Sequence, residues 1–330
     1  MIFHSLKLRI FAIAMLSFVA ALSPAQAQKW PDKPIRLIVP APAGGIADAV
    51  ARLLAEQLRV NSGQIVLVDN KPGGSAVVAE RALMSAPADG HTLMVGPSSM
   101  MTDIPLAVKK PYDPTKSFTY VAEAAGMVHV LVKNTSFPPN NIPELLEYAK
   151  LKPQSVSIAS LSPGNRSDFL SEILREKSNN SMVVAPYKGS APALTDLMGN
   201  HVQLTFDVVT NVVPFIQSGK LSALAVASAT RSPHLPNVPS FGELGLPDLV
   251  MPDAGVGVFM LSSTPKPLGD QIQNELQKVI NSSKFREALT AQGLDYPKNA
   301  SIEQLRQRLE ATTNHNKKII EKLKLKISPN

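Results

Sequence analysis

The sequence predicts two α/β lobes, because the same three features occur in two successive parts of the chain. Short runs rich in valine, isoleucine and leucine alternate with stretches whose apolar residues recur at helical spacing. Turns that contain glycine or proline separate the two kinds of segment. Since strands separated by helices are typical of a parallel sheet covered by helices, each part is expected to form one such layered unit.

The first set of elements holds three predicted strands. Ile35–Val39 is expected to be a buried strand, and apolar residues recur at helical spacing after it. A helix is therefore expected from Ile46 to about Arg59. The remaining elements of this set are the strands Ile65–Val68 and Thr92–Val95 and a helix over Val77–Met84.

The second set repeats this alternation. Its predicted strands are Val128–Val132, Ser155–Ala159, Met182–Val184, Val202–Phe206 and Leu221–Ala227. Its predicted helices are Ile142–Leu151, Ser167–Lys177, Ala191–Met198 and Val209–Gln217. A proline-rich loop follows, and the rest of the chain is predicted to be mostly helical and to pack back onto the first lobe. The chain is expected to cross between the lobes near Val121–Val128 and to return near Ala223–Ala227.

The N-terminus has the parts of a secretory signal peptide. Lys7 and Arg9 give a positive start, and the 13 residues Ile10–Leu22 are apolar. This apolar run is shorter than the ~20 residues that span a bilayer. Residues 1–27 are therefore predicted to be removed by a cut after Ala27, which places the mature protein in the periplasm. An amphipathic or buried N-terminal helix is the alternative.

Composition sets the size and class of the mature protein. The remaining 303 residues are enough for two domains of ordinary size. We assign residues 28–125 together with 227–330 to lobe 1 and residues 126–226 to lobe 2. Because the chain contains no cysteine, disulfides and a lipoprotein anchor are excluded, and buried cores have to supply the stability.

Charge and motif content exclude several functions. The formal charge of +7 becomes +5 once Lys7 and Arg9 are removed, which favours anionic ligands weakly through electrostatic steering. Aromatic residues make up 5% of the chain and no basic run is interleaved with them, which argues against nucleic acid as a partner. The sequence has no Gly-x-Ser-x-Gly motif, no cysteine nucleophile and no histidine pair at metal-ligand spacing. We therefore predict no catalytic residue, no metal site and no cofactor.

The most informative segment is the loop Pro40–Asp48, between the first strand and the first helix. Gly44 and Gly45 let backbone N–H groups approach a ligand, and the helix N-terminus carries partial positive charge. The loop lacks the lysine and hydroxyl pair of a phosphate-binding P-loop, so a carboxylate fits better than a polyphosphate. Two simpler interpretations are that the loop only caps the helix and that Asp48 only complements the helix dipole.

Three further loops at strand ends have similar chemistry. They are Lys71–Ser75, Gly96–Ser99 and Ser160–Asp168. Each alone is as consistent with a turn as with a ligand site, but ligands in open α/β sheets bind outside the carboxyl ends of the strands. Donor-rich loops in both lobes therefore predict a cleft between them. Arg166 would pair there with a second carboxylate in a bidentate fork, and a solvated surface arginine is the alternative.

Several short motifs stand in a characteristic order along the chain. They are Trp30–Ile35, Pro42–Asp48, Asp69–Gly74, Ala88–Leu93, Pro111–Pro114, Pro186–Gly199, Phe206–Asp207, Ser218–Leu221 and Arg231–Pro239. Each motif is weak alone, but together they extend over nearly the whole mature chain. In their order and spacing the chain resembles the Bug-type receptors, the solute-binding proteins of tripartite tricarboxylate transporters.

This resemblance implies a type II periplasmic-binding-protein fold, in which two α/β lobes are joined by a two-strand hinge. It also implies ligands that carry carboxylates, such as di- and tricarboxylates, acidic amino acids or aromatic acids. In that family the first strand-to-helix loop and the facing loop of the second lobe hold one carboxylate, partly through water. Carried over by position, with Arg166 added from the loop chemistry, the expected ligand-binding residues are Ala43, Gly44, Asp48, Ser75, Ser98, Ser160, Gly164, Arg166, Gly189 and Asp207.

The chain departs from the family pattern in the expected pocket. A serine and a proline precede Gly164, Arg166 is unusual, and Asp168 stands where the family usually has a histidine. Ala41 stands where an aromatic residue is common. Ligand identity can therefore not be inherited from any relative.

The function predicted on these grounds is a monomeric periplasmic receptor. It would capture an organic acid by hinge closure and deliver it to membrane transporter subunits. The alternative partner is the outer domain of a sensor kinase, to which the same lobes would present the ligand. A periplasmic enzyme acting on a carboxylate ester or amide is a third hypothesis, but the sequence offers it no nucleophile–base pair.

Overall fold

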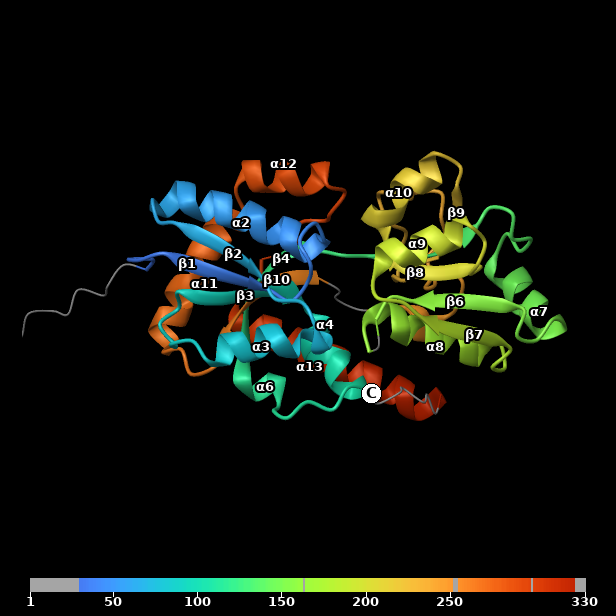
Figure 1. Cartoon of the computed structure of the whole chain (residues 1–330), viewed down its shortest axis with the longest axis horizontal. Helices are drawn as coiled ribbons and strands as arrows, with labels where there is room; N and C mark the ends of the chain where they lie inside the picture. Colours follow the sequence, from blue (N-terminus) through green and yellow to red (C-terminus); the bar gives the residue numbers. More distant parts are fainter. Residues whose placement is uncertain (1–29, 163, 252–254, 298, 324–330) are drawn as a thin grey trace, which may run out of the picture.

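The computed structural model describes residues 30–162, 164–251, 255–297 and 299–323. Two α/β lobes lie side by side, and each is built on a five-stranded sheet (Figure 1). The predicted two-lobed α/β architecture is therefore confirmed. The predicted signal peptide and its cut after Ala27 lie outside the described residues.

Lobe 1 contains the sheet β2-β1-β3-β10-β4. Its strands are β1 (Ile35–Val39), β2 (Val66–Asn70), β3 (Thr92–Pro97), β4 (Phe118–Gly126) and β10 (Gly255–Leu261). β1 pairs in parallel with β2 and β3, whereas β10 runs antiparallel to β3 and β4. Within β1, Leu37 and Ile38 are buried in cores on opposite faces of the sheet, so this strand has to be apolar throughout.

Lobe 2 contains the sheet β7-β6-β8-β5-β9. Its strands are β5 (His129–Asn134), β6 (Val156–Ser160), β7 (Met182–Pro186), β8 (Leu204–Val208) and β9 (Leu221–Val226). β6 pairs in parallel with β7 and β8, and β5 runs antiparallel to β8 and β9. The expectation of parallel sheets is thus wrong for one strand in each lobe. In each lobe this is the strand with which the chain enters from the other lobe, β10 in lobe 1 and β5 in lobe 2. It runs antiparallel to the two strands beside it in the sheet.

Helices cover both faces of each sheet, and apolar clusters fill the spaces between the layers. Lobe 1 carries α2 (Ile46–Ser62), the 3-10 turn η1 (Gly74–Ala76), α3 (Val77–Met84), α4 (Ser99–Thr102), α5 (Ile104–Ala107), α6 (Pro114–Ser117), α11 (Lys266–Ile280) and α12 (Ser283–Ala291). Lobe 2 carries α7 (Ile142–Leu151), α8 (Arg166–Lys177), α9 (Ser190–Met198), α10 (Val209–Gln217) and the 3-10 turn η2 (Pro247–Leu249), and α13 (Ile302–Leu323) follows α12. Among the described residues, none of the helices is both long and apolar enough to span a bilayer.

Strand β10 was not expected, because the C-terminal part of the chain was predicted to be mostly helical. Its sequence contains glycines at Gly255 and Gly257, which are uncommon inside strands. The sheet requires both. A Cβ on Gly257 would lie 2.2 Å from the ring of Tyr120 and 2.4 Å from the carbonyl oxygen of Ala122, and one on Gly255 would lie 2.8 Å from the carbonyl oxygen of Ala125. The close approach of β4 therefore explains why glycine stands inside this strand, where it weakens the strand pattern of the sequence.

Between the strands of the two sheets, the described part of the chain crosses twice, as the predicted two-strand hinge requires. The first crossing runs from β4 to β5, and the second is the long return from β9 to β10. Most of this return belongs to lobe 2, because Phe241 and Leu249 are completely buried in its core and Met251 nearly so. Lobe 2 therefore continues past residue 226, where its end was expected, as far as Met251.

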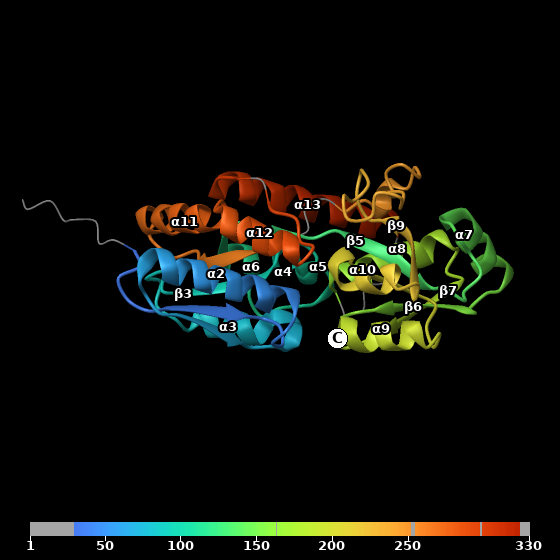
Figure 2. The same cartoon turned by 90° about the horizontal axis from the view of Figure 1, so that it is seen from above.

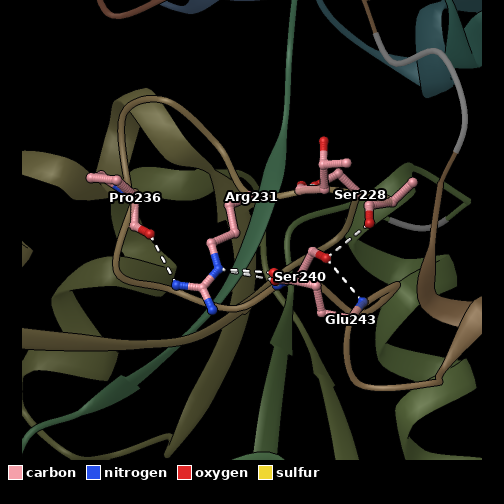
Figure 3. A network of polar contacts seen from close by, with 7 residues as sticks. Ser228, Arg231, Pro236, Ser240 and Glu243 are labelled. Carbon is pink, nitrogen blue, oxygen red and sulfur yellow. Dashed lines mark hydrogen bonds and ion pairs between the residues drawn. The ribbon is translucent and has the colours of Figure 1, made fainter.

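Side chains fix the return loop from within (Figure 3). Arg231 Nε lies 3.0 Å from Glu243 Oε1, and Arg231 Nη1 donates to the carbonyl oxygen of Pro236 at 3.1 Å. The backbone N–H of Ser240 donates to Glu243 at 2.8 Å, and its hydroxyl donates to the carbonyl oxygen of Ala229 at 3.0 Å. The motif that begins at Arg231 thus has a structural basis, since its arginine closes the loop.

Helix α13 links the two lobes (Figure 2). Leu305 is buried in lobe 1, whereas Ile319 is buried in the core of lobe 2. Lys322 Nζ lies 2.9 Å from a carboxylate oxygen of Asp248 in η2. The prediction that the C-terminal helices pack on lobe 1 holds for α11 and α12 but is wrong for the end of α13. Its 22 residues extend ~33 Å, which is enough to reach past lobe 1.

Candidate functional site

A cleft of about 870 Å³ is lined by residues of both lobes, among them residues of the first turns of α2, α9 and α10. From lobe 1 it is lined by Pro42, Ala43, Gly44, Gly45, Ile46, Ala49, Gln292 and Leu294. From lobe 2 it is lined by Lys188, Gly189, Ser190, Ala191, Pro192, Leu194, Thr195, Met198, Thr210, Asn211 and Phe215. The cleft therefore brings together three of the expected site residues, namely Ala43, Gly44 and Gly189.

The three helix ends at the cleft share one feature that suits an anion. None of α2, α9 and α10 has a side chain that caps its N-terminus, as is also true of α3 and α11, whereas α7, α8 and α12 are capped by Asn141, Asn165 and Ser282. The first N–H groups of a helix have no partner inside the helix, and they carry the positive end of its dipole. The cleft thus offers N–H donors from both lobes to a negatively charged group.

Asp48 holds the first loop in shape and does not line the cleft. Its carboxylate is buried and accepts hydrogen bonds from Gly44 N (2.9 Å), Arg52 Nε (2.9 Å) and Asn70 Nδ2 (3.0 Å). Burial acts to raise the pKa of Asp48, but the hydrogen bonds from Arg52, Gly44 and Asn70 together bring it below its usual value. Asp48 therefore positions the glycines, and the simpler interpretation of this residue as a dipole partner is incomplete.

Replacement of Asp48 tests this positioning role. Asp48→Ala removes a buried, charged acceptor, and we expect the free energy of unfolding to fall by about 2–3 kcal/mol, with weaker ligand binding. Glu56→Ala is the matched control on the same helix, because Glu56 is exposed and pairs with Arg59 at 3.0 Å. We expect it to change stability by about 1 kcal/mol or less and binding not at all. Urea unfolding and calorimetric titration measure both effects, and unchanged binding in Asp48→Ala would refute the role.

Asp207 has the corresponding position in lobe 2, directly behind the cleft. This completely buried carboxylate accepts hydrogen bonds from the Ser190 hydroxyl, from Asn211 Nδ2 at 2.8 Å and from Val208 N at 2.7 Å. Burial raises the pKa of Asp207, and these hydrogen bonds oppose that rise. Since Ser190 and Asn211 both line the cleft, Asp207 fixes two lining side chains at the starts of α9 and α10.

The loop before α8, which the resemblance makes part of the pocket, satisfies its own donors. Asn165 caps α8 by accepting from Asp168 N at 2.9 Å. Asp168 in turn accepts from the hydroxyl of Ser160 at 2.7 Å and from Gly164 N at 2.8 Å. The aspartate at the family's histidine position thus occupies the groups expected to bind a ligand. Neither Ser160 nor Gly164 lines the cleft.

Arg166 joins the lobes through a protein carboxylate. Its side chain and that of Asp103 are buried, with Arg166 Nε 3.0 Å from Asp103 Oδ2. Asp103 also accepts a hydrogen bond from Asn316 on α13. The expected fork to a ligand carboxylate is therefore not what the structure shows, and neither is the alternative of a solvated arginine.

Gly164 lies in the same contact between the lobes. Its φ of +73° is left-handed, and a Cβ there would lie 2.8 Å from the Cβ of Ala107 in α5. The loop before α8 is thus packed directly against lobe 1. Together with the Arg166–Asp103 pair, this contact holds the lobes together on the side of the molecule that carries α13.

Two expected serines lie elsewhere in lobe 1. Ser98 is buried and ties β3 to β10, because its N–H donates to the carbonyl oxygen of Gly255 at 2.8 Å and its hydroxyl accepts from Gly255 N at 3.3 Å. Ser75 lies in η1 with a φ of +48°. Neither residue is among those that line the cleft.

Sequence reasoning missed several lining residues. Lys188 and Ser190 stand in the motif Pro186–Gly199, so their neighbourhood was recognisable although their roles were not. Thr210 is the second residue of α10, and its buried hydroxyl has no hydrogen-bond partner among the described residues. Gln292 and Leu294 come directly after α12, in a segment that no local pattern connects with the cleft. Within the described part of the chain, no cluster of histidine and acidic residues could hold a metal ion.

Comparison with known proteins identifies the family. The family model for the tripartite tricarboxylate transporter family receptor matches residues 50–325. The chain belongs to this family. It is 32% identical over 273 residues to the protein BugT of Bordetella pertussis, covering 82% of this chain and 83% of BugT. The resemblance to Bug-type receptors is thereby confirmed.

Solved structures of similar proteins agree with this assignment. The receptor matches the periplasmic binding protein BugD with a TM-score of 0.79 and 32% identity, over 90% of this chain and 99% of that one. It matches the R. palustris protein Rpa4515 with adipate at a TM-score of 0.82 and 27% identity, over 91% and 100% of the two chains. The type II periplasmic-binding fold is thus confirmed, and the chain is a solute-binding receptor of this family.

Proposed function

We propose that this receptor works in the periplasm, captures a small organic acid in the cleft and delivers it to the membrane subunits of a tripartite tricarboxylate-type transporter. The observation that carries the proposal is the convergence of three uncapped helix N-termini, from both lobes, on one cleft beside Lys188. A carboxylate held there contacts both lobes at once. Its binding therefore favours the arrangement in which the lobes are close together.

The residues that line the cleft suit the binding of a ligand and not the catalysis of a reaction. Ser190 is the hydroxyl beside a carboxylate, yet it donates its proton to Asp207 and no histidine stands among the residues that line the cleft. The lining thus lacks the histidine base of a Ser–His pair. The related protein Rpa4515 was solved with adipate, a dicarboxylate, which supports an organic acid as the ligand of this chain. We accordingly propose a binding role and no turnover.

A panel of organic acids tests the proposed function. Thermal unfolding of the mature chain is followed with each acid and with the amide of the same acid, because a ligand that binds only the folded state raises the melting temperature. At least one acid should raise it, and its amide should not. If no acid in a broad panel shifts the transition, the proposed carboxylate receptor is refuted. Uptake by spheroplasts that depends on added receptor then tests delivery.

Asp207→Asn tests the lobe 2 half of the site. The amide keeps the size of the side chain but turns one acceptor into a donor toward Ser190 or Asn211, so at least one of these lining side chains should lose its position. We expect the dissociation constant of the acid found in the panel to rise about tenfold or more, equivalent to about 1.4 kcal/mol. Circular dichroism checks that the variant folds. Unchanged affinity in a folded variant would show that the ligand does not depend on these two side chains.

A further inference from the structure

The charges around the cleft limit how many carboxylates it can accept. Lys188 is the one charged side chain among its lining residues, all of which the structure describes. A carboxylate taken out of water without a cation or several donors beside it is strongly disfavoured. A tricarboxylate would place at least one anionic group against uncharged walls.

The helix N-termini favour one anionic group beside Lys188, but they do not replace the cations that a second or third carboxylate would need. At α2, the carboxylate of Asp48 already sits in the first turn and is bound by Gly44 N–H and by Arg52. At α9 and α10, the carboxyl group of Asp207 lies behind the lining residues, and its donors, Ser190, Asn211 and a backbone N–H, are all neutral. Protein carboxyl groups therefore offset part of the positive potential at both sides of the cleft.

The remaining lining side chains are uncharged, and five of them are large and apolar, beside the polar residues Ser190, Thr195, Thr210, Asn211 and Gln292. Ile46 faces it from lobe 1, and Leu194, Met198 and Phe215 face it from lobe 2, with Leu294 on the α12 side. At about 870 Å³ the cleft lies at the upper end of the usual size of small-molecule sites. Methionine and aromatic side chains of this kind favour contact with a hydrocarbon chain or ring.

We propose that the ligand is a monocarboxylate with an uninterrupted apolar body, a chain or a ring, and that Lys188 and Phe215 select it. The carboxylate lies at Lys188, between the first turns of α9 and α2, so that it contacts both lobes. The body lies against Ile46, Met198 and Phe215. This inference rests on the proposed function and narrows its ligand class. The proposed ligand class differs from adipate, the dicarboxylate with which the related Rpa4515 was solved.

A pair of acids that differ at one end tests the proposal. Hexanoate and adipate share a six-carbon chain, which ends in a methyl group in one and in a second carboxylate in the other. Calorimetric titration of the mature chain should give a dissociation constant for hexanoate, or for 3-phenylpropanoate as the ring analogue, that is about tenfold or more below that of adipate. Hexanamide, which has no charge, should not bind.

Two variants locate the ends of the ligand. Lys188→Gln should raise the dissociation constant of hexanoate about tenfold, because it removes a charged partner. Phe215→Ala should reduce the preference for hexanoate over acetate, since acetate has no body to contact the ring. Lys220→Gln is the matched control, because Lys220 is an exposed lysine of lobe 2 outside the cleft, and it should leave binding unchanged.

The outcomes separate this inference from the function on which it rests. Preferred binding of hexanoate or 3-phenylpropanoate, lost in Lys188→Gln, supports the proposal. Binding of adipate or citrate that equals or exceeds that of both monocarboxylates overturns it and leaves an organic-acid receptor in place. If none of these acids binds, the proposal fails, and failure across the wider panel refutes the receptor function as well.

Discussion

Asp103→Ala is expected to lower the free energy of unfolding by about 3–5 kcal/mol, the range for breaking a buried ion pair. Asp103 and Arg166 are both buried, and removal of the carboxylate leaves the guanidinium charge between the lobes without it. Asn316 on α13 loses its acceptor in the same step. Chemical denaturation of the wild type and the variant measures the difference.

Two comparisons make this expectation specific. Glu303→Ala breaks an exposed pair with Arg306, 2.7 Å long, and should change stability by about 1 kcal/mol or less. The double replacement Asp103→Leu with Arg166→Met should recover most of the loss, because an apolar pair of similar size often replaces a buried ion pair without cost. An effect of Asp103→Ala as small as that of Glu303→Ala would mean that the pair is open to water in solution.

Acid should destabilise this receptor through His129, which lies at the start of β5 beside the hinge. Burial, and secondly the charge of Arg166, lowers the pKa of His129 from its ordinary value of 6.5 to about 3. Between these two pH values the unfolded chain binds a proton that the folded chain does not. The free energy of unfolding therefore falls as the pH falls from 6.5 toward 3, by about 1.4 kcal/mol per pH unit from this residue.

Replacement of the ring isolates this contribution. His129→Phe has no titrating group, so its stability should fall less steeply with decreasing pH than that of the wild type. Urea unfolding from pH 7 to pH 4 gives both slopes, and their difference removes the contributions of other groups. His201→Gln serves as the control, because the His201 side chain is 74% exposed and should not affect the slope. Equal slopes for His129→Phe and the wild type would show that His129 takes up its proton in the folded state.

Local sequence patterns were sufficient to predict most helices and strands and the lobe 1 side of the cleft. The helix predicted over Val77–Met84 has those bounds in the structure, and the glycine-bearing loop after β1 lines the cleft. Both follow from short-range physics, because apolar spacing sets the helix and glycine permits the close approach of a backbone. The start of α9 was recognisable for the same reason, although Lys188 had no assigned role.

The loop before α8 shows why some of the expected site residues do not line the cleft. Its serine, glycine and arginine have the composition of a ligand site, but each is bound by protein. Asp168 accepts from Ser160 and Gly164, and Asp103, 63 residues from Arg166 in the chain, pairs with the arginine. Donors in a loop bind whichever acceptor the fold brings near, so composition alone cannot tell a ligand from a neighbouring lobe.

The sequence by itself determined the alternation of strands and helices, the membership of a receptor family and the position of the glycine loop at a strand end. Tertiary structure alone decided that β10 completes the first sheet, that α13 reaches the second lobe and that Gln292 and Leu294 close the cleft. The reason is the range of the interactions. Spacing and turn chemistry act over a few residues, whereas strand pairing, buried charge pairs and cleft walls join residues that are distant in the chain.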